Sequence, residues 1–234
     1  MNNAAEVILE LKKCASPEKA DVLLRFFKTG PGEYGYGDIF LGITMPQIHS
    51  LVRNCGNLSY GEIKKLIDSK FHEARMMGLL CLVARTKGAD IKTRKMIASI
   101  YLAKRALVNN WDLVDLSAPK VLGEYLQVAP KEIKLLEKLS KEKLMWSRRI
   151  AILATFALIR AGQFSQTLKL AERYLSDKED LMHKATGWML REVGKRDVDV
   201  LRTFLNKHRK QMPRTMLRYA IEKFSPSERK YFMN

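Results

Sequence analysis

A recurring helical segment is the feature that most constrains how this chain folds. Four stretches set a basic residue ahead of small and large apolar residues: Arg75-Met76-Met77-Gly78, Arg149-Ile150-Ala151-Ile152, Lys184-Ala185-Thr186-Gly187 and Arg214-Thr215-Met216-Leu217. The first gap spans two steps of about 37 residues, and the next two gaps are about 35 and about 30 residues long. A period in the thirties indicates a unit that buries its apolar face by stacking on its neighbours.

The segments around these marks have helical periodicity. From Ser59 onward the breaks are single glycines or prolines, and sustained alternation with β-branched residues is absent, so essentially no strand is expected. We predict helices at about 59–69, 71–87, 90–105, 110–116, 119–127, 130–139, 145–161, 164–176, 179–194, 197–207 and 212–223. Two helices per period predict an all-α solenoid of HEAT-like repeats; the alternative is an irregular helical bundle whose similarities are coincidental.

The first part of the chain has a different pattern. Helices are expected at about 4–14, 17–28 and 46–55, the second with Ser16 as N-cap and Pro17 at its first position. Between them, residues 29–38 form a loop rich in glycine. It lacks the Gly-Lys-Ser/Thr of a phosphate-binding loop, so it is either a flexible connector or a loop whose Tyr34 and Tyr36 contact a ligand.

These patterns predict one all-helical domain over residues 1–234. Its parts would be N-terminal helices with the Gly/Tyr loop (1–58), repeats (59–224) and a tail (225–234). Cys14, Cys55 and Cys81 have no metal-ligand spacing, so we expect buried thiols in a reduced cytoplasmic protein without a structural metal. No apolar run is long enough to cross a membrane, and the N-terminus lacks a signal-peptide pattern.

The charge balance points to a polyanionic partner. The chain has 42 Lys and Arg against 25 Asp and Glu, a net charge of +17. Nucleic acid is the first candidate partner, an anionic membrane surface the second, and a generally basic protein without such a partner the third. In a solenoid, basic residues that recur at the start of the second helix of each repeat would form one stripe on a concave basic face and follow a phosphate backbone. The members of this stripe would be Arg75, Arg148, Arg149, Lys184, Arg191, Arg214 and Arg218.

The stretch from Asn110 to Asp115 falls where one basic mark is missing. Trp111 and Asp115 are four residues apart, so they share a face if this stretch is helical. Asp112 is interpreted as a helix-start residue, because acidic side chains favour the first turn. Trp146, directly before two arginines, is expected in the core. Trp188 follows Gly187, where a neighbouring backbone can approach closely.

A carboxylate beside indole rings on a DNA-binding face favours one kind of chemistry. Metal-dependent nucleases need clustered carboxylates, and lyases need a marked lysine nucleophile; neither pattern is present. Cleavage of the bond between a sugar and a cationic base needs no general acid, because the charge already activates the leaving group. A carboxylate stabilises the oxocarbenium-like sugar, and indole faces attract cationic rings.

Several motifs resemble the AlkD-type DNA alkylation repair glycosylases. They are Phe26-Phe27-Lys28, Phe40-Leu41-Gly42-Ile43, Asn110-Trp111-Asp112-Leu113-Val114-Asp115, Trp146-Ser147-Arg148-Arg149-Ile150 and Lys184-Ala185-Thr186-Gly187-Trp188. The resemblance implies a right-handed superhelical solenoid and a monomer. It also implies monofunctional, cofactor-free excision of cationic N3- and N7-alkylated purines from double-stranded DNA.

The resemblance also implies site residues. The family's catalytic Asp falls on Asp115, its stacking tryptophans on Trp111 and Trp188, and its phosphate-contacting Arg on Arg149. Further DNA contacts are expected from Arg148, Lys184, Arg191, Phe27, Thr44 and Arg214. This sequence departs from some relatives at Asn110, where they have a tryptophan, and at Phe26 and Phe27, near which some have a tyrosine.

Three functions from different classes remain open at this point. The first is a glycosylase for alkylated purines. The second is a HEAT-type DNA-binding protein without turnover. The third is a solenoid whose basic face binds an acidic protein. Asp115 favours the first over the second, since phosphate binding alone does not need a carboxylate; steep salt dependence of DNA binding would argue against the third.

Overall fold

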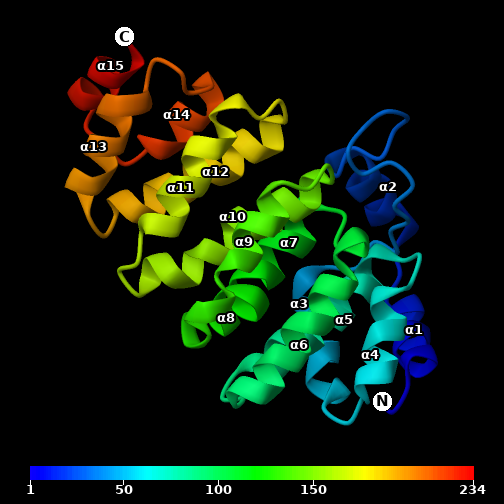
Figure 1. Cartoon of the computed structure of the whole chain (residues 1–234). Coiled ribbons are helices and arrows are strands. Elements are labelled where there is room, and N and C mark those ends of the chain that lie inside the picture. The colour runs from blue at the N-terminus through cyan, green and yellow to red at the C-terminus, as the bar shows by residue number, and fades with distance from the viewer. The chain divides into compact units, whose positions relative to one another are not determined.

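The computed structural model describes all residues, 1–234, and it is helical throughout (Figure 1). The only β-type pairing is an isolated bridge between Ile39 and Phe71. The prediction of an all-α fold is therefore confirmed. The right-handed superhelix and its concave basic face stay predictions. No helix has both the length and the apolar character that a membrane span requires.

The chain forms two compact units, residues 1–117 (unit 1) and residues 118–234 (unit 2). The helices of unit 1 are α1 (Ala4–Lys13), α2 (Pro17–Phe26), α3 (Met45–Val52), α4 (Tyr60–Ile67), α5 (His72–Thr86), α6 (Ile91–Ala103) and α7 (Trp111–Ala118), which reaches the boundary. Those of unit 2 are α8 (Glu124–Val128), α9 (Lys134–Ser140), α10 (Met145–Arg160), α11 (Ser165–Arg173), α12 (Asp180–Gly194), α13 (Val198–His208), α14 (Arg214–Ala220) and α15 (Pro226–Met233).

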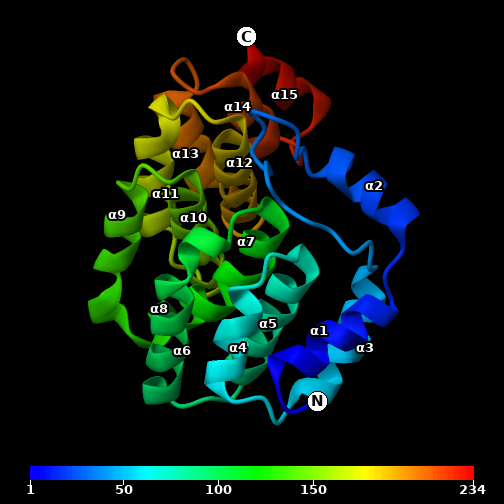
Figure 2. The same cartoon turned by 90° about the vertical axis from the view of Figure 1, so that its right-hand side faces the viewer.

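Unit 1 is built around α5, against which α1, α3, α4 and α6 pack (Figures 1 and 2). This helix is buried on nearly every side over its first turns, which explains its continuous run of small and apolar residues. Local signals fix the helix starts. Ser16 accepts a hydrogen bond from the Lys19 amide at the start of α2, with Pro17 at the first position, as predicted. Thr44 and Gln47 form a capping box on α3.

Unit 2 is built around α10 and α12. α10 packs on α9 and α11, and α12 packs on α10, α13 and α14. A Cβ atom on Gly187 of α12 would lie 2.4 Å from the carbonyl oxygen of Met216 on α14, so these backbones come too close for any side chain there. The close approach predicted at Gly187 is confirmed. Trp146 is buried in α10, as expected for a core residue.

Two secondary-structure expectations differ from the structure. The segment 225–234, expected as a tail, forms α15, which starts at Pro226 behind the N-cap Ser225. Pro119, expected to separate two helices, instead begins a π-helical turn that spans Pro119–Gly123 and leads into α8. Pro119 has no N–H to donate to a carbonyl oxygen of the last turn of α7, and the wider π-helical turn lies where the regular α-helical hydrogen bonding is interrupted.

Candidate functional site

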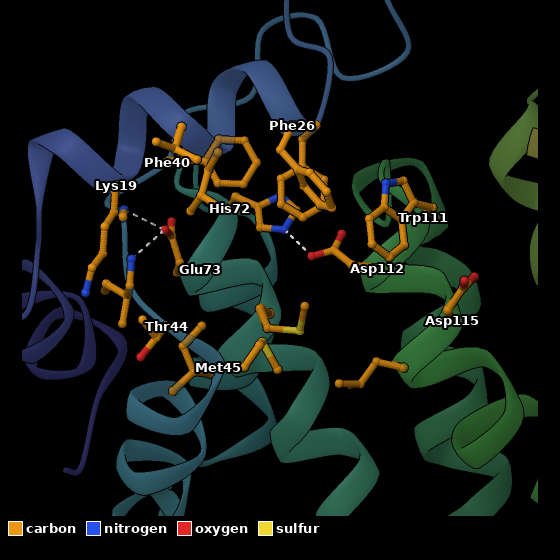
Figure 3. Close-up of a pocket in the computed structure, with 18 residues that line it drawn as sticks. Lys19, Phe26, Phe40, Thr44, Met45, His72, Glu73, Trp111, Asp112 and Asp115 are labelled. Atoms are coloured by element: carbon orange, nitrogen blue, oxygen red, sulfur yellow. Dashed lines mark hydrogen bonds and ion pairs between the residues drawn. The ribbon is translucent and has the colours of Figure 1, made fainter.

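Unit 1 contains an open cavity of about 580 Å³ with predominantly apolar walls. Helices α2, α3, α5 and α7 and the segment 40–44 contribute side chains to it. Figure 3 shows Lys19 and Thr44 at one end and Trp111 and Asp115, on successive turns of α7, at the other. An apolar hollow with a few polar groups at its edge is the usual form of a ligand site.

The wall formed by residues 41–43 is held by Glu73. Its carboxylate accepts hydrogen bonds from the backbone amides of Leu41 and Gly42 at 2.9 Å and of Ile43 at 3.3 Å. Gly42 has φ +81°, and a Cβ there would lie 2.1 Å from the Ser16 carbonyl oxygen, so only glycine fits. The three amide donors supply the hydrogen bonds that the buried Glu73 carboxylate needs. The same bonds hold the backbone of residues 41–43 against α5, so this side of the cavity is fixed in place.

An aromatic cluster supports one side of the cavity. Phe27 stacks on Phe40, with 5.0 Å between ring centroids and 11° between planes, and lies 5.3 Å from Trp111. Phe26 meets Trp111 edge-on at 5.9 Å. Phe27 is buried and packs against the Trp111 ring from the interior. Phe26 is 60% exposed, so the aromatic residue beside Trp111 on the solvent side is Phe26.

The predicted pairing of Trp111 with Asp115 is present in α7. Both side chains are half-buried and both line the cavity. Asn110 precedes the helix: its backbone carbonyl accepts from the Val114 amide at 3.2 Å, and its side-chain oxygen accepts from the Trp111 amide at 2.8 Å. Asp115 also acts on Tyr101 of α6: burial raises the pKa of that phenol, and the nearby carboxylate charge raises it further.

A buried polar network that the sequence analysis missed lies next to this pair. His72 is 3% exposed, with Nδ1 3.3 Å from Oδ2 of Asp38 and Nε2 2.8 Å from Oδ2 of Asp112 (Figure 3 shows the second contact). Arg75 donates to Oδ1 of Asp38 at 2.6 Å. Asp112 still stands in the first turn of α7 as predicted, but it also joins this helix to α5.

The network shifts the pKa values of two of its members. Burial alone would lower the pKa of His72, but hydrogen bonds to Asp112 and Asp38 outweigh it and leave that pKa above its ordinary value of 6.5. Burial alone would raise the pKa of Asp38, but His72 and the Arg75 charge outweigh it, so that pKa lies below 3.8. The structure therefore favours a charged His72 between two carboxylates.

Trp188 and Arg149 belong to unit 2. The indole N–H of Trp188 donates to Glu192 at 3.3 Å, and its ring lies 6.2 Å from Phe156. Arg149 is 4% exposed and donates a hydrogen bond to the carbonyl oxygen of Leu181. Both residues lie in the central helices of this unit, α12 and α10.

The proposed basic stripe needs correction at Arg75. This side chain is 4% exposed and paired with Asp38, because the recurring position in α5 faces the interior. It therefore takes no part in a surface that follows phosphates. Other members have acidic partners within unit 2: Arg148 with Asp177, Lys184 with Asp180 and Arg191 with Glu222. Arg214 and Arg218, on α14, are exposed.

No group of three or more His, Cys, Asp or Glu side chains is arranged to hold a metal ion. Cys55 and Cys81 are buried and Cys14 is half-buried, which places the thiols largely inside unit 1.

Comparison with known proteins assigns the chain. A family model described as DNA alkylation repair enzyme matches residues 7–224. The chain belongs to the DNA alkylation repair enzyme family. Among solved structures it is similar to one titled "Predicted DNA alkylation repair enzyme from Enterococcus faecalis", with a TM-score of 0.71 and 15% identity over 91% of this chain and 97% of that one. That likeness concerns the fold. No curated protein matches.

The family resemblance drawn from the sequence is thereby confirmed, and two of its expected DNA contacts change in this DNA alkylation repair protein. Phe27 is 7% exposed and packs inside the aromatic cluster, so its exposed neighbour Phe26 is the side chain that a ligand can reach. Thr44 lines the cavity, but its side chain is also engaged in the capping box of α3. Helical periodicity did not show which of the two is exposed, because the helix ends at Phe26 and Phe27, its C-cap, is buried by Phe40 and Trp111 from other segments.

Proposed function

We propose that this protein is a monofunctional DNA glycosylase that hydrolyses the N-glycosidic bond of cationic N3- and N7-alkylated purines in double-stranded DNA. The observation that carries the proposal is Asp115 one helical turn from Trp111 at the edge of an aromatic-lined cavity, in a member of the DNA alkylation repair enzyme family. The net charge of +17 supports a duplex as the partner.

The proposed chemistry uses the carboxylate of Asp115. The C1′–N bond breaks with its electron pair going to the base, which leaves neutral because it began as a cation. Asp115 stabilises the positive charge that develops on the sugar and orients the water that adds to C1′; the water proton passes to the carboxylate or to solvent. The face of Trp111 attracts the cationic base and the sugar, and Trp188 of unit 2 is proposed as a further stacking residue for the DNA.

DNA binding is assigned to the basic residues of unit 2 and to the exposed aromatic of unit 1. Arg148, Lys184 and Arg191 would exchange their carboxylate partners for phosphates, and Arg214 is exposed for a direct contact. Arg149 would hold a phosphate from its buried position beside Leu181. Phe26 would stack on an exposed base or sugar.

The test is release of 7-methylguanine from methylated duplex DNA, followed by chromatography of the free base. Asp115→Asn should abolish release and leave DNA binding intact or stronger. The matched control is Asp68→Asn, which removes an exposed carboxylate of the same unit that pairs with Lys104; it should release base at the wild-type rate. Wild-type release by Asp115→Asn would reject the catalytic assignment. DNA binding without release by the wild-type protein would favour a non-catalytic DNA-binding protein, and absence of DNA binding would favour a protein partner.

A further inference from the structure

The buried pair of His72 and Asp112 connects two helices that both line the cavity. His72 is the first residue of α5, and Asp112 lies in the first turn of α7, between Trp111 and Asp115. The sequence analysis did not select His72 and assigned Asp112 only to the helix start, since the two residues that pair are 40 positions apart in the chain. A contact of this kind sets where α7 begins relative to the rest of unit 1.

The hydrogen-bond chemistry of the pair requires a proton. Both ring nitrogens of His72 face carboxylate oxygens, those of Asp38 and Asp112. An ionised carboxylate only accepts hydrogen bonds, and a neutral imidazole has one N–H, so only the imidazolium can donate to both. The charges that face the ring are Asp38 from the segment before Phe40, Asp112 from α7 and Arg75 from α5 itself.

The two carboxylates depend on His72 to different degrees. Asp38 also accepts hydrogen bonds from Arg75 at 2.6 Å, from Asn109 at 2.8 Å and from Asn110 at 3.3 Å. Oδ2 of Asp112 bonds to His72, and Oδ1 accepts from the Leu113 amide within α7. His72 is thus the contact through which the Asp112 side chain is anchored outside its own helix.

We propose that His72, as an imidazolium, is a positioning residue that anchors Asp112 and thereby fixes Trp111 and Asp115 at the edge of the cavity. As an imidazolium it also compensates the charge of the Asp112 carboxylate, which it contacts at 2.8 Å. Stacking of the His72 ring on Phe40 at 4.4 Å, with 25° between planes, holds the imidazolium in orientation. The expected effect of His72 on kcat rests on the proposed glycosylase function, whereas the protonation of His72 can be tested without any activity.

The first arm of the test follows His72 by NMR in protein with ¹³C-labelled histidine, between about pH 5 and 9. The expected midpoint for His72 lies above 6.5, and in Asp112→Asn it moves to lower pH. Exposed His49 on α3 is the internal control, and its signals at each pH should be the same in both proteins. A His72 midpoint at or below 6.5, or one unchanged by Asp112→Asn, overturns the proposal. This arm is independent of any enzymatic activity.

The second arm measures kcat and KM for 7-methylguanine release across the same pH range. The wild-type kcat should fall as His72 loses its proton. Asp112→Asn should lack this fall, because an amide can donate to a neutral imidazole. His72→Ala should lower kcat about 10- to 100-fold with little change in KM, and His72→Gln, which keeps a donor toward Asp112, should recover most of it. An alkaline fall in Asp112→Asn like that of the wild type overturns the proposal. Inactive wild-type protein with the expected NMR midpoints rejects the glycosylase function alone.

Discussion

Phe27 lies 5.3 Å from Trp111, with 31° between their rings, and Phe26, the next residue back, meets the same indole edge-on. Adjacent residues on α2 and its C-cap therefore have different relations to one tryptophan. Phe27 is part of the packed interior, whereas Phe26 is open to solvent. This difference separates residues that position the site from residues that can touch a ligand.

Phe27→Leu should lower both stability and base release, because it removes buried ring contacts beneath Trp111. We expect a loss of about 1–3 kcal/mol in the free energy of unfolding. Phe26→Leu is the matched variant: its unfolding free energy should stay within about 0.5 kcal/mol of the wild type, while its DNA affinity falls about tenfold. Urea unfolding and fluorescence anisotropy measure the two quantities. Equal effects of both substitutions on stability would contradict this division.

Arg214→Ala should weaken binding to all DNA sequences alike and lower the slope of log K against log salt by about one. Its guanidinium is exposed at the start of α14. Arg149→Ala should reduce the same slope and, in addition, destabilise unit 2, since Arg149 is buried against Leu181. Titrations at several salt concentrations decide this; an unchanged slope in either variant removes that arginine from the phosphate contacts.

Gly187→Ala should destabilise the protein by about 1–3 kcal/mol, because the added methyl would meet the Met216 carbonyl and Tyr219. Gly61 on α4 provides the control: a Cβ there meets only Ser59 Oγ, at 3.5 Å. Gly61→Ala should be neutral or stabilising, by up to about 1 kcal/mol, from helix propensity alone. Thermal unfolding midpoints are measured for both variants. Equal midpoints would contradict this prediction and would mean that α14 can shift away from Gly187 to make room for the methyl group.

The buried network should limit stability at both ends of the pH scale. Asp38 has a lowered pKa, so its contribution is present above its unfolded value of 3.8 and is lost as pH falls through the lower folded value. His72 has a raised pKa, so its contribution is complete below 6.5 and is lost as pH rises through the higher folded value. The free energy of unfolding should therefore be higher for the wild type than for Asp38→Asn at pH values above 3.8. This difference should shrink as the pH falls below 3.8. His72→Gln should approach the wild type as the pH rises. Parallel curves for wild type and variants would contradict this assignment.

Local patterns were sufficient for much of the fold. Helical periodicity, single glycine and proline breaks and caps such as Ser16-Pro17 predict most helices within a few residues of their bounds. The four-residue spacing of Trp111 and Asp115 places both beside the cavity. That a neighbouring backbone can approach closely at Gly187 also follows from the absence of a side chain there, and the Met216 carbonyl of α14 does so.

Long-range pairing explains what the sequence could not predict. The recurring basic residues look alike in sequence, yet their surroundings differ: Arg75 is buried in an ion pair with Asp38, 37 positions away, whereas Arg149 is buried beside the carbonyl oxygen of Leu181 and Arg214 is exposed. His72 had no distinguishing neighbour in sequence, since its partners come from a loop and from α7. Which of Phe26 and Phe27 is exposed depends on where Phe40 and Trp111 pack, information that α2 alone does not contain.

The hydrogen bonds from the amides of residues 41–43 to Glu73 affect how the cavity would bind a ligand. A wall fastened to the core in the unbound protein loses little conformational entropy when a ligand arrives, so more of the contact energy appears as affinity. Because these backbone positions are fixed, residues 41–43 do not change conformation to fit a ligand of a different shape. Discrimination at this side of the cavity would then depend on shape, with misfitting ligands leaving quickly.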